Sequence, residues 1–114
     1  MKECNFSYEK MSDNLFLFEP LGKSVQSISI GNFILDYNMR GILVGIEIIN
    51  ASSTLAECVT DKDTCLCFLS SLKECYFEIK KTDNFLILKL DLKSKIEEIH
   101  PILYLSFENL PITC

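Results

Sequence analysis

Apolar and polar residues alternate along residues 25–30, 33–37 and 42–49, and this period of two predicts three half-buried β-strands. Gly31-Asn32 separates the first two segments and suits a two-residue hairpin with a type II′ turn. Asn38-Met39-Arg40-Gly41 separates the next two, where Gly41 can take a positive φ without steric cost. The pattern therefore predicts antiparallel hairpins over residues 25–49.

The two turns fix a register that gathers apolar side chains on one face. With Ile30 opposite Phe33, and Tyr37 opposite Ile42, Leu35 falls opposite Val44. A slip by one residue would mix apolar and polar positions, so the turn chemistry and the pattern support each other. The predicted inward set is Ile28, Ile30, Phe33, Leu35, Tyr37, Ile42, Val44, Ile46 and Ile48, and the other face carries Ser27, Ser29, Ile34, Asp36, Leu43, Gly45, Glu47 and Ile49.

A strand at 14–18 is expected to join the same sheet, and a helix at about 63–73 follows the first group of strands. Asp63 or Thr64 can cap this helix. Thr54 and Glu57 have the spacing of a capping box, which indicates a short helical turn before it. The helical period turns Cys65, Phe68, Leu69 and Leu72 to one face.

A second hairpin is predicted around the polar turn 81–84, with Lys80 opposite Phe85 and a last strand at 102–107. Its inward residues are Cys75, Phe77, Ile79, Leu86, Leu88, Leu90 and Leu92, joined by Leu103, Leu105 and Phe107. We thus expect one α+β domain over residues 1–114, with a mainly antiparallel sheet of four N-terminal strands, one helix and three C-terminal strands. The alternative is two small sheets packed face to face with the helix at one end.

Composition narrows the classes of partner. The net charge of −5, with scattered Lys and Arg, disfavours nucleic-acid binding. No apolar run approaches the length that crosses a membrane, and no apolar stretch follows a basic start at the N-terminus. We expect a cytoplasmic protein without membrane partners, in which the six cysteines are reduced.

Four cysteines, Cys58, Cys65, Cys67 and Cys75, are the candidates for a metal site. Structural zinc sites usually pair thiolates two to four residues apart on a turn. Within a helix, Cys65 and Cys67 would point about 200° apart around the axis, so core packing of Cys65 and Cys75 explains the pattern better. Cys4 and Cys114 lie near the termini, where exposure is expected.

Catalytic constellations are weak. Cysteine nucleophiles need a base, and the single histidine, His100, precedes Pro101 at the start of a strand, where an edge position near solvent is expected. Asp36 and Glu47 share a face but are expected to be too far apart for acid–base chemistry. Common nucleotide, metalloprotease and hydrolase motifs are absent from the sequence. We therefore predict no catalytic residues and no cofactor.

The segment from about Met11 to Ser52 resembles the domain of unknown function 2283 family of small prokaryotic proteins. Asp36-Tyr37, Gly41 and the string VGIEIINAS at residues 44–52 carry the resemblance. Asn38 stands where the family often has Asp, and Arg40 also departs from its acidic pattern, which weakens cation binding at this turn. The resemblance implies a fold without an assigned reaction, and for some members an antitoxin-like binding role.

Gly45 interrupts a strand that is otherwise rich in β-branched residues, and such a Gly often marks close approach by another element. We expect the helix or a second protomer to pack over a face made of Ile34, Leu43, Gly45 and Ile49. The favoured function is a non-enzymatic interaction module that binds a protein partner or forms a homodimer. The alternative is a metal-binding or thiol-dependent enzyme or sensor that uses Cys58, Cys65, Cys67 or Cys75.

Overall fold

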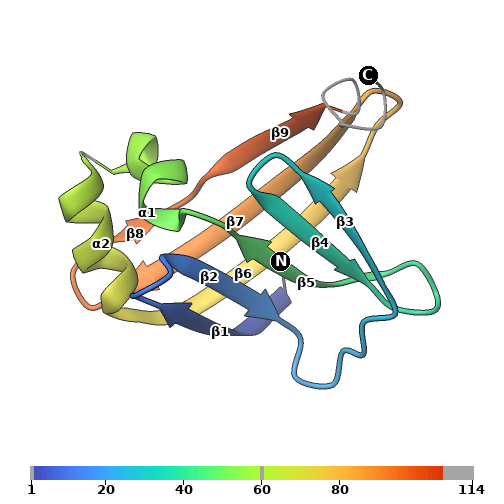
Figure 1. Cartoon of the computed structure of the whole chain (residues 1–114), viewed down its shortest axis with the longest axis horizontal. Coiled ribbons are helices and arrows are strands. Elements are labelled where there is room, and N and C mark those ends of the chain that lie inside the picture. The colour runs from blue at the N-terminus through green and yellow to red at the C-terminus, as the bar shows by residue number, and fades with distance from the viewer. Residues whose placement is uncertain (1, 60, 107–114) are drawn as a thin grey trace.

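The computed structural model describes residues 2–59 and 61–106, and these residues form nine strands, two short α-helices and one 3₁₀ turn (Figure 1). The strands make one antiparallel sheet in the order β3-β4-β5-β2-β1-β6-β7-β8, and β9 also pairs with β7. This confirms the antiparallel sheet in outline and adds two strands, β1 and β8, that the pattern did not predict. The strands are β1 (Lys2–Glu9), β2 (Asn14–Phe18), β3 (Gln26–Ile30), β4 (Phe33–Tyr37), β5 (Leu43–Ile48), β6 (Leu72–Lys81), β7 (Phe85–Ser94), β8 (Glu98–Ile99) and β9 (Ile102–Ser106).

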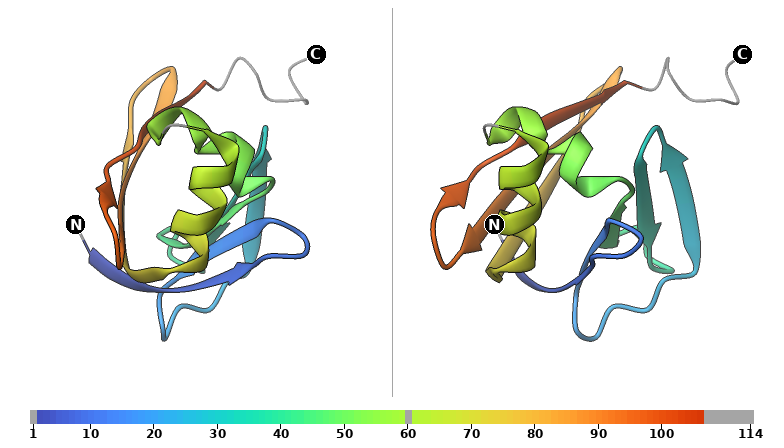
Figure 2. Two further views of the ribbon diagram at one scale, coloured as in Figure 1. Left: turned by 90° about the vertical axis from the view of Figure 1, so that its left-hand side faces the viewer. Right: turned by 60° about the vertical axis from the view of Figure 1, so that its left-hand side comes forward.

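Strand β1 joins the two halves of the sheet. Its first residues pair with β6, where Cys4 lies opposite Cys75, and its later residues pair with β2, where Phe6 lies opposite Leu17. The sheet bends there, so its halves face each other across a shared core and the helices lie at one open end (Figure 2). The two predicted alternatives are thereby combined, because the sheet is continuous through β1 and yet folded over.

The helical segment contains α1 (Ala51–Thr54), the 3₁₀ turn η1 (Ala56–Cys58) and α2 (Lys62–Ser70). The predicted helix at 63–73 is thus shorter at its C-terminal end, because β6 begins at Leu72. Its cap is Asp61, whose carboxylate accepts from Thr64 N–H at 2.8 Å, and not Asp63 or Thr64. The inward residues of α2 are buried as the helical period predicts: Cys65, Phe68 and Leu69.

The expected helical turn near Thr54 exists, but Thr54 does not cap it. Residue Asn50, at φ 53°, precedes α1, and Thr54 is the last residue of that helix. The Thr54 hydroxyl instead donates to the Ile49 carbonyl at 3.1 Å and accepts from the Asn32 side-chain amide at 3.3 Å, so it ties α1 to the end of β5 and to the β3–β4 turn.

The first hairpin has the predicted register. Ile30 lies opposite Phe33 and Ile28 opposite Leu35, and Gly31 takes φ 58° as the first turn position requires. Five residues of this hairpin and of β5 that are predicted to face inward lie in the buried core. These are Phe33, Leu35, Ile46 and Ile48, with Ile30. The prediction for Ile28 is wrong, because this side chain on the edge strand β3 is 36% exposed.

The pairing of β4 with β5 is shifted from the prediction by one residue at Tyr37, and a bulge between Asp36 and Tyr37 in the ladder adds a second residue to the shift at Leu35. Leu35 lies opposite Ile46 and not Val44, and Tyr37 lies opposite Leu43. A bulge adds one residue to one strand and changes which side chains face inward. Leu43 therefore joins the core, while Ile42 is left 52% exposed.

The second hairpin keeps the predicted face but slides by two residues. Lys81 pairs with Leu86 and Ile79 with Leu88, because the Thr82 hydroxyl accepts from Phe85 N–H at 3.0 Å and closes a tighter turn. A shift of two leaves every side chain on the same face. The buried residues of β7 are Leu86, Leu88, Leu90 and Leu92.

The last strand, β9, confirms part of the predicted 102–107 segment. Leu105 is buried and Leu103 packs against the core, whereas Phe107 lies outside the described residues. Between β8 and β9, Leu90 N–H donates to the Pro101 carbonyl at 3.0 Å, so β7 keeps a hydrogen bond where the proline interrupts the edge.

Candidate interaction surface

The four predicted interface residues do not form one exposed patch. Leu43 is 5% exposed and lies in the core, because the bulge turns its side chain inward. Ile34 and Ile49 are half-buried. A Cβ on Gly45 would lie 3.2 Å from Asp36 Oδ2, so the close approach there comes from a neighbouring strand and not from the helix. Packing of a second protomer over Gly45 stays a prediction.

The four candidate metal ligands differ in exposure. Cys65 and Cys75 are buried in the core, whereas Cys58 and Cys67 are exposed. Across residues 2–59 and 61–106, no three His, Cys, Asp or Glu side chains gather so that they could hold a metal ion. Burial raises the pKa of Cys65 to about 11, which disfavours the reactive thiolate.

Cys4, expected to be exposed, is instead 6% exposed. Its Sγ donates to the Cys75 carbonyl on the neighbouring strand at 3.3 Å. Burial, with the nearby carboxylates of Glu3 and Glu19, raises the pKa of Cys4 to about 12. The residue is missed as a core residue because β1 itself was not predicted, and Cys114 lies outside the described residues.

His100 is exposed, as expected for a strand edge, and contacts carboxylates and not a thiol. Its Nδ1 lies 2.7 Å from Asp91 Oδ1, and its Nε2 lies 3.8 Å from Glu98 Oε2. This arrangement gives no support to Cys–His chemistry, because the recorded partners of His100 within the described part of the chain are carboxylates.

A partly buried polar cluster joins the β1–β2 turn to α1. The Asp13 carboxylate accepts from the Ser52 hydroxyl at 2.6 Å, from Ser52 N–H at 3.1 Å and from the Tyr8 hydroxyl at 2.5 Å. Ser52 is fully buried, so its hydroxyl has no access for a substrate. Partial burial acts to raise the pKa of Asp13, but the hydrogen bonds from Ser52 and Tyr8 outweigh it and lower this pKa. The cluster therefore holds the β1–β2 turn against α1 and stabilises the fold.

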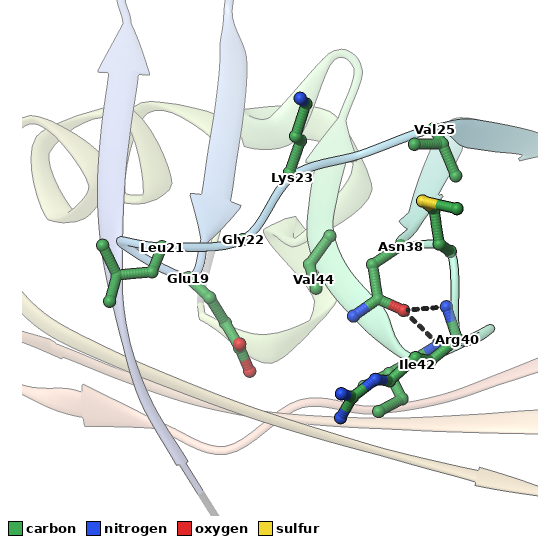
Figure 3. Close-up of a pocket in the computed structure, with 10 residues that line it drawn as sticks. Glu19, Leu21, Gly22, Lys23, Val25, Asn38, Arg40, Ile42 and Val44 are labelled. Atoms are coloured by element: carbon green, nitrogen blue, oxygen red, sulfur yellow. Dashed lines mark hydrogen bonds between the residues drawn. The ribbon is translucent and has the colours of Figure 1, made fainter.

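At the other end of β2 and β5, two turns enclose a hollow of about 430 Å³ (Figure 3). We call it the loop-end hollow. Its lining comes from the β2–β3 connection, the β4–β5 turn and the start of β5. The lining residues are Glu19, Leu21, Gly22, Lys23, Val25, Asn38, Met39, Arg40, Ile42 and Val44.

The first wall is a turn over residues 19–22. Gly22 N–H donates to the Glu19 carbonyl at 3.0 Å, and Pro20 occupies the second position, where its fixed φ favours a turn. Glu19 N–H donates to the Val44 carbonyl at 2.9 Å and ties the turn to β5. A Cβ on Gly22 would lie 2.8 Å from Val44 Cβ, so only glycine lets the turn lie this close to the strand.

The second wall is the turn Asn38–Gly41. Gly41, at φ 74°, donates its N–H to the Asn38 carbonyl at 3.0 Å. The Asn38 side-chain oxygen accepts from Arg40 N–H at 2.9 Å and from Ile42 N–H at 3.0 Å (Figure 3). These bonds hold the backbone of both turns, so their outward side chains are presented from a fixed frame.

The rim of the hollow is apolar and exposed. Leu21 is 97% exposed and Met39 88%, at the tips of the two turns, while Val25 and Ile42 are more than half exposed. Val44 lies beneath them and is buried. Single exposed apolar side chains are ordinary, but four around one hollow mark a surface suited to contact with another molecule.

Charge at the hollow is mainly positive. Glu19 is paired with Lys2, with 3.2 Å between Oε1 and Nζ. Lys23 and Arg40 also line the hollow, and neither forms an ion pair with any described residue. Its described lining residues include no Cys, His or Ser, and the hollow offers apolar contact and positive charge.

The alternation of apolar and polar residues does not predict this surface, because it locates strands and leaves turn residues only as breaks between them. A signal was nevertheless present: Leu21 and Met39 are large apolar residues within segments whose neighbours, Pro20, Gly22 and Gly41, are turn formers. Turn tips are usually polar. Apolar residues at two such tips therefore point to an exposed contact surface.

Comparison with known proteins assigns no function. The chain is 36% identical over 50 residues to "Uncharacterized protein MJ0789" of Methanocaldococcus jannaschii, and the match covers 44% of this chain and 43% of that protein. The chain thus spans less than half the length of the curated relative that it matches. This similarity is consistent with an uncharacterised family.

No protein-family model matches the chain, so the resemblance to the domain of unknown function 2283 family is not confirmed. No solved structure matches it either. Among the described residues, the helices are too short or too polar to cross a bilayer.

Proposed function

We propose that this protein is a non-enzymatic interaction module that binds a protein partner at the loop-end hollow. The observation that carries the proposal is the group of four exposed apolar side chains on two hydrogen-bonded turns: Leu21, Val25, Met39 and Ile42. Leaving such a group in water is unfavourable, and burial against a partner removes that cost.

The rigid turns make the hollow suitable for binding. A partner that docks on a preformed surface loses less conformational entropy than one that must order a loop. Met39 adds adaptability at the rim, because its unbranched thioether side chain fits surfaces of different shape. The partner is a separate protein or a second copy of the chain, and an antitoxin-like role is one form of such binding.

The five described cysteines are free thiols, which suits action in a reducing compartment, the cytoplasm. The described lining of the hollow contains no cysteine. Binding at the hollow is therefore expected to be insensitive to thiol alkylation, which separates the proposal from the thiol-dependent alternative.

The direct test compares the wild type with the double variant Leu21→Ser/Met39→Ser in pulldowns from native lysate, quantified by mass spectrometry, with light scattering on each purified protein. The matched control is Met11→Ser/Ile96→Ser, which removes similar apolar side chains that are 99% and 77% exposed elsewhere. We expect a protein captured by the wild type and the control, or a dimer formed by both, to be lost in the hollow variant. Equal capture and equal mass for all three proteins would refute the proposal.

A further inference from the structure

Resting on the proposed function, we propose that the partner presents an extended, acidic segment that adds as a strand to the free edge of β3 and places an apolar side chain in the loop-end hollow. Three features carry the inference: the open backbone of β3, its continuity with the hollow, and two cations that have no ion-pair partner within the described residues.

Strand β3 is an open edge of the sheet. Among the described strands it pairs only with β4, and four of its five residues are exposed. The two-residue turn makes Ile30 and Phe33 a hydrogen-bonded pair, so alternation along the ladder directs the N–H and C=O groups of Ser27 and Ser29 away from β4.

Edge strands are usually protected by charge, proline or a covering element. The five residues of β3, QSISI, contain neither a charge nor a proline. An extended segment can therefore pair with this edge through backbone hydrogen bonds, the mode known as β-strand addition.

The edge runs directly into the hollow. Val25 precedes the first residue of β3 and lines the hollow, and its N–H donates to the Tyr37 carbonyl at 2.9 Å, which fixes its position. A segment paired along Ser27 and Ser29 that continues past Gln26 therefore meets the rim formed by Val25 and Met39. An apolar side chain at that point can be buried among the exposed apolar residues.

Charge selects the partner. Lys23 and Arg40 lie at the hollow and form no ion pair with residues 2–59 or 61–106, although the chain as a whole carries −5. Elsewhere, Lys93 lies 3.9 Å from both Glu74 and Glu98 and 5.4 Å from the centre of the Tyr76 ring. A local positive rim on an acidic protein attracts acidic residues of a partner and disfavours basic ones.

The test is selection of displayed random decapeptides against the purified full chain. We expect enrichment of peptides that combine an apolar residue with Asp or Glu. The variant Lys23→Glu/Arg40→Glu is expected to lose the acidic preference and to bind the enriched peptides about tenfold more weakly or worse. The control Lys10→Glu/Lys95→Glu makes the same change in net charge at exposed lysines outside the hollow. This control is expected to keep the acidic preference and the affinity for the enriched peptides.

Strand addition has its own readout, amide hydrogen exchange with the best peptide bound. We expect Ser27 and Ser29 to gain protection. Enriched peptides without acidic bias, equal binding by the charge variant, or unchanged exchange at these amides would each overturn the inference. A selection that enriches no peptide would also overturn the inference. The same holds if the hollow binds anionic phospholipid vesicles or a second copy of the chain but binds no peptide.

The two tests separate the claims. If Leu21→Ser/Met39→Ser abolishes partner capture while Lys23→Glu/Arg40→Glu leaves it intact, the proposed function stands and this inference fails. If neither variant changes capture, both fail.

Discussion

The two ends of the β2–β5 strand pair differ in whether their polar and charged groups have partners within the described protein. At the helix end, the Asp13 carboxylate accepts three hydrogen bonds from Ser52 and Tyr8, and Ser52 is fully buried. At the loop end, Lys23 and Arg40 line a hollow without an ion pair among the described residues. At the helix end of β2 and β5, polar groups therefore form hydrogen bonds within the protein. At the loop end of the same strands, the charged groups face outward.

This difference separates stability from binding. Hydrogen bonds inside the helix end stabilise the fold, because breaking one leaves a buried group without a partner. Replacing the exposed side chains at the hollow changes the stability of the free protein little, since these side chains bury little area in the fold. Changes at the helix end should therefore lower stability, and changes at the rim of the hollow should lower binding.

The largest effect is expected from Asp13→Ala. It removes the acceptor of Ser52 and Tyr8, and it places an alanine at φ 58°, a conformation that Asp tolerates better. We expect a loss of about 2–3 kcal/mol in the free energy of unfolding, mainly because Ser52 is left unsatisfied in the core. Urea unfolding followed by circular dichroism measures it.

Two controls separate the causes. Asp13→Gly also removes the carboxylate but accepts the positive φ, so it should be less destabilising than Asp13→Ala. Asp83→Ala, an exposed position in the β6–β7 turn, should change stability by less than about 0.5 kcal/mol. A loss at Asp13 no larger than that at Asp83 would show that the cluster does not lock the helix end.

A smaller effect is expected from Gly22→Ala. The added Cβ would lie 2.8 Å from Val44 Cβ and 3.3 Å from the Glu19 carbonyl oxygen, so the 19–22 turn must move away from β5. Overpacking of this kind costs about 1–2 kcal/mol. We expect this loss in urea unfolding, together with weaker partner capture, because Leu21 moves with the turn.

The matched comparison is Gly31→Ala, which has open space around its Cβ position but a φ of 58°. It should cost stability through backbone strain while leaving capture unchanged, since Gly31 lies at the opposite end of β3 from Val25. If Gly22→Ala leaves capture at the wild-type level, the position of the first turn does not control the hollow.

Pattern and turn chemistry predict the strands that form tight hairpins. The β3–β4 register follows from Gly31-Asn32, and the inward faces of β6 and β7 follow from alternation. Pattern and turn chemistry do not predict a strand whose formation depends on contacts with residues distant in the sequence. Strand β1 reads as weak alternation of Cys4, Phe6 and Tyr8, and it becomes a strand because β2 and β6 provide partners on its two sides.

The candidate site is harder to predict than the fold. The bulge in β5 moves Leu43 into the core, and this change depends on how β4 and β5 close around Asn38–Gly41. The hollow requires two turns, separated by strands β3 and β4, to lie side by side. No periodicity encodes that arrangement, although apolar residues at both turn tips, Leu21 and Met39, hint at it.

Acid should weaken the helix end through Asp13, whose pKa is lowered in the folded protein by its hydrogen bonds. A carboxyl group with a lowered folded pKa stabilises the fold above its unfolded pKa, near 4. This contribution is lost as pH falls below about 4 and through the folded pKa, because protonation then removes the charged acceptor. We expect the urea midpoint of the wild type to fall between pH 5 and pH 3 more steeply than that of Asp13→Asn. Parallel slopes would place the acid sensitivity elsewhere.

The smallest effect on stability is expected from Leu21→Ser/Met39→Ser. Both side chains are almost fully exposed, so their removal deletes little buried area, and the change in unfolding free energy should stay within about 0.5 kcal/mol. The turns should persist, because the backbone of each is held by Glu19 and Asn38 and not by the tip side chains. Urea unfolding of the variant that is used for partner capture gives the measurement. A loss above about 1 kcal/mol would mean that the tips help to hold the fold, and the division between a stabilising end and a binding end would then fail.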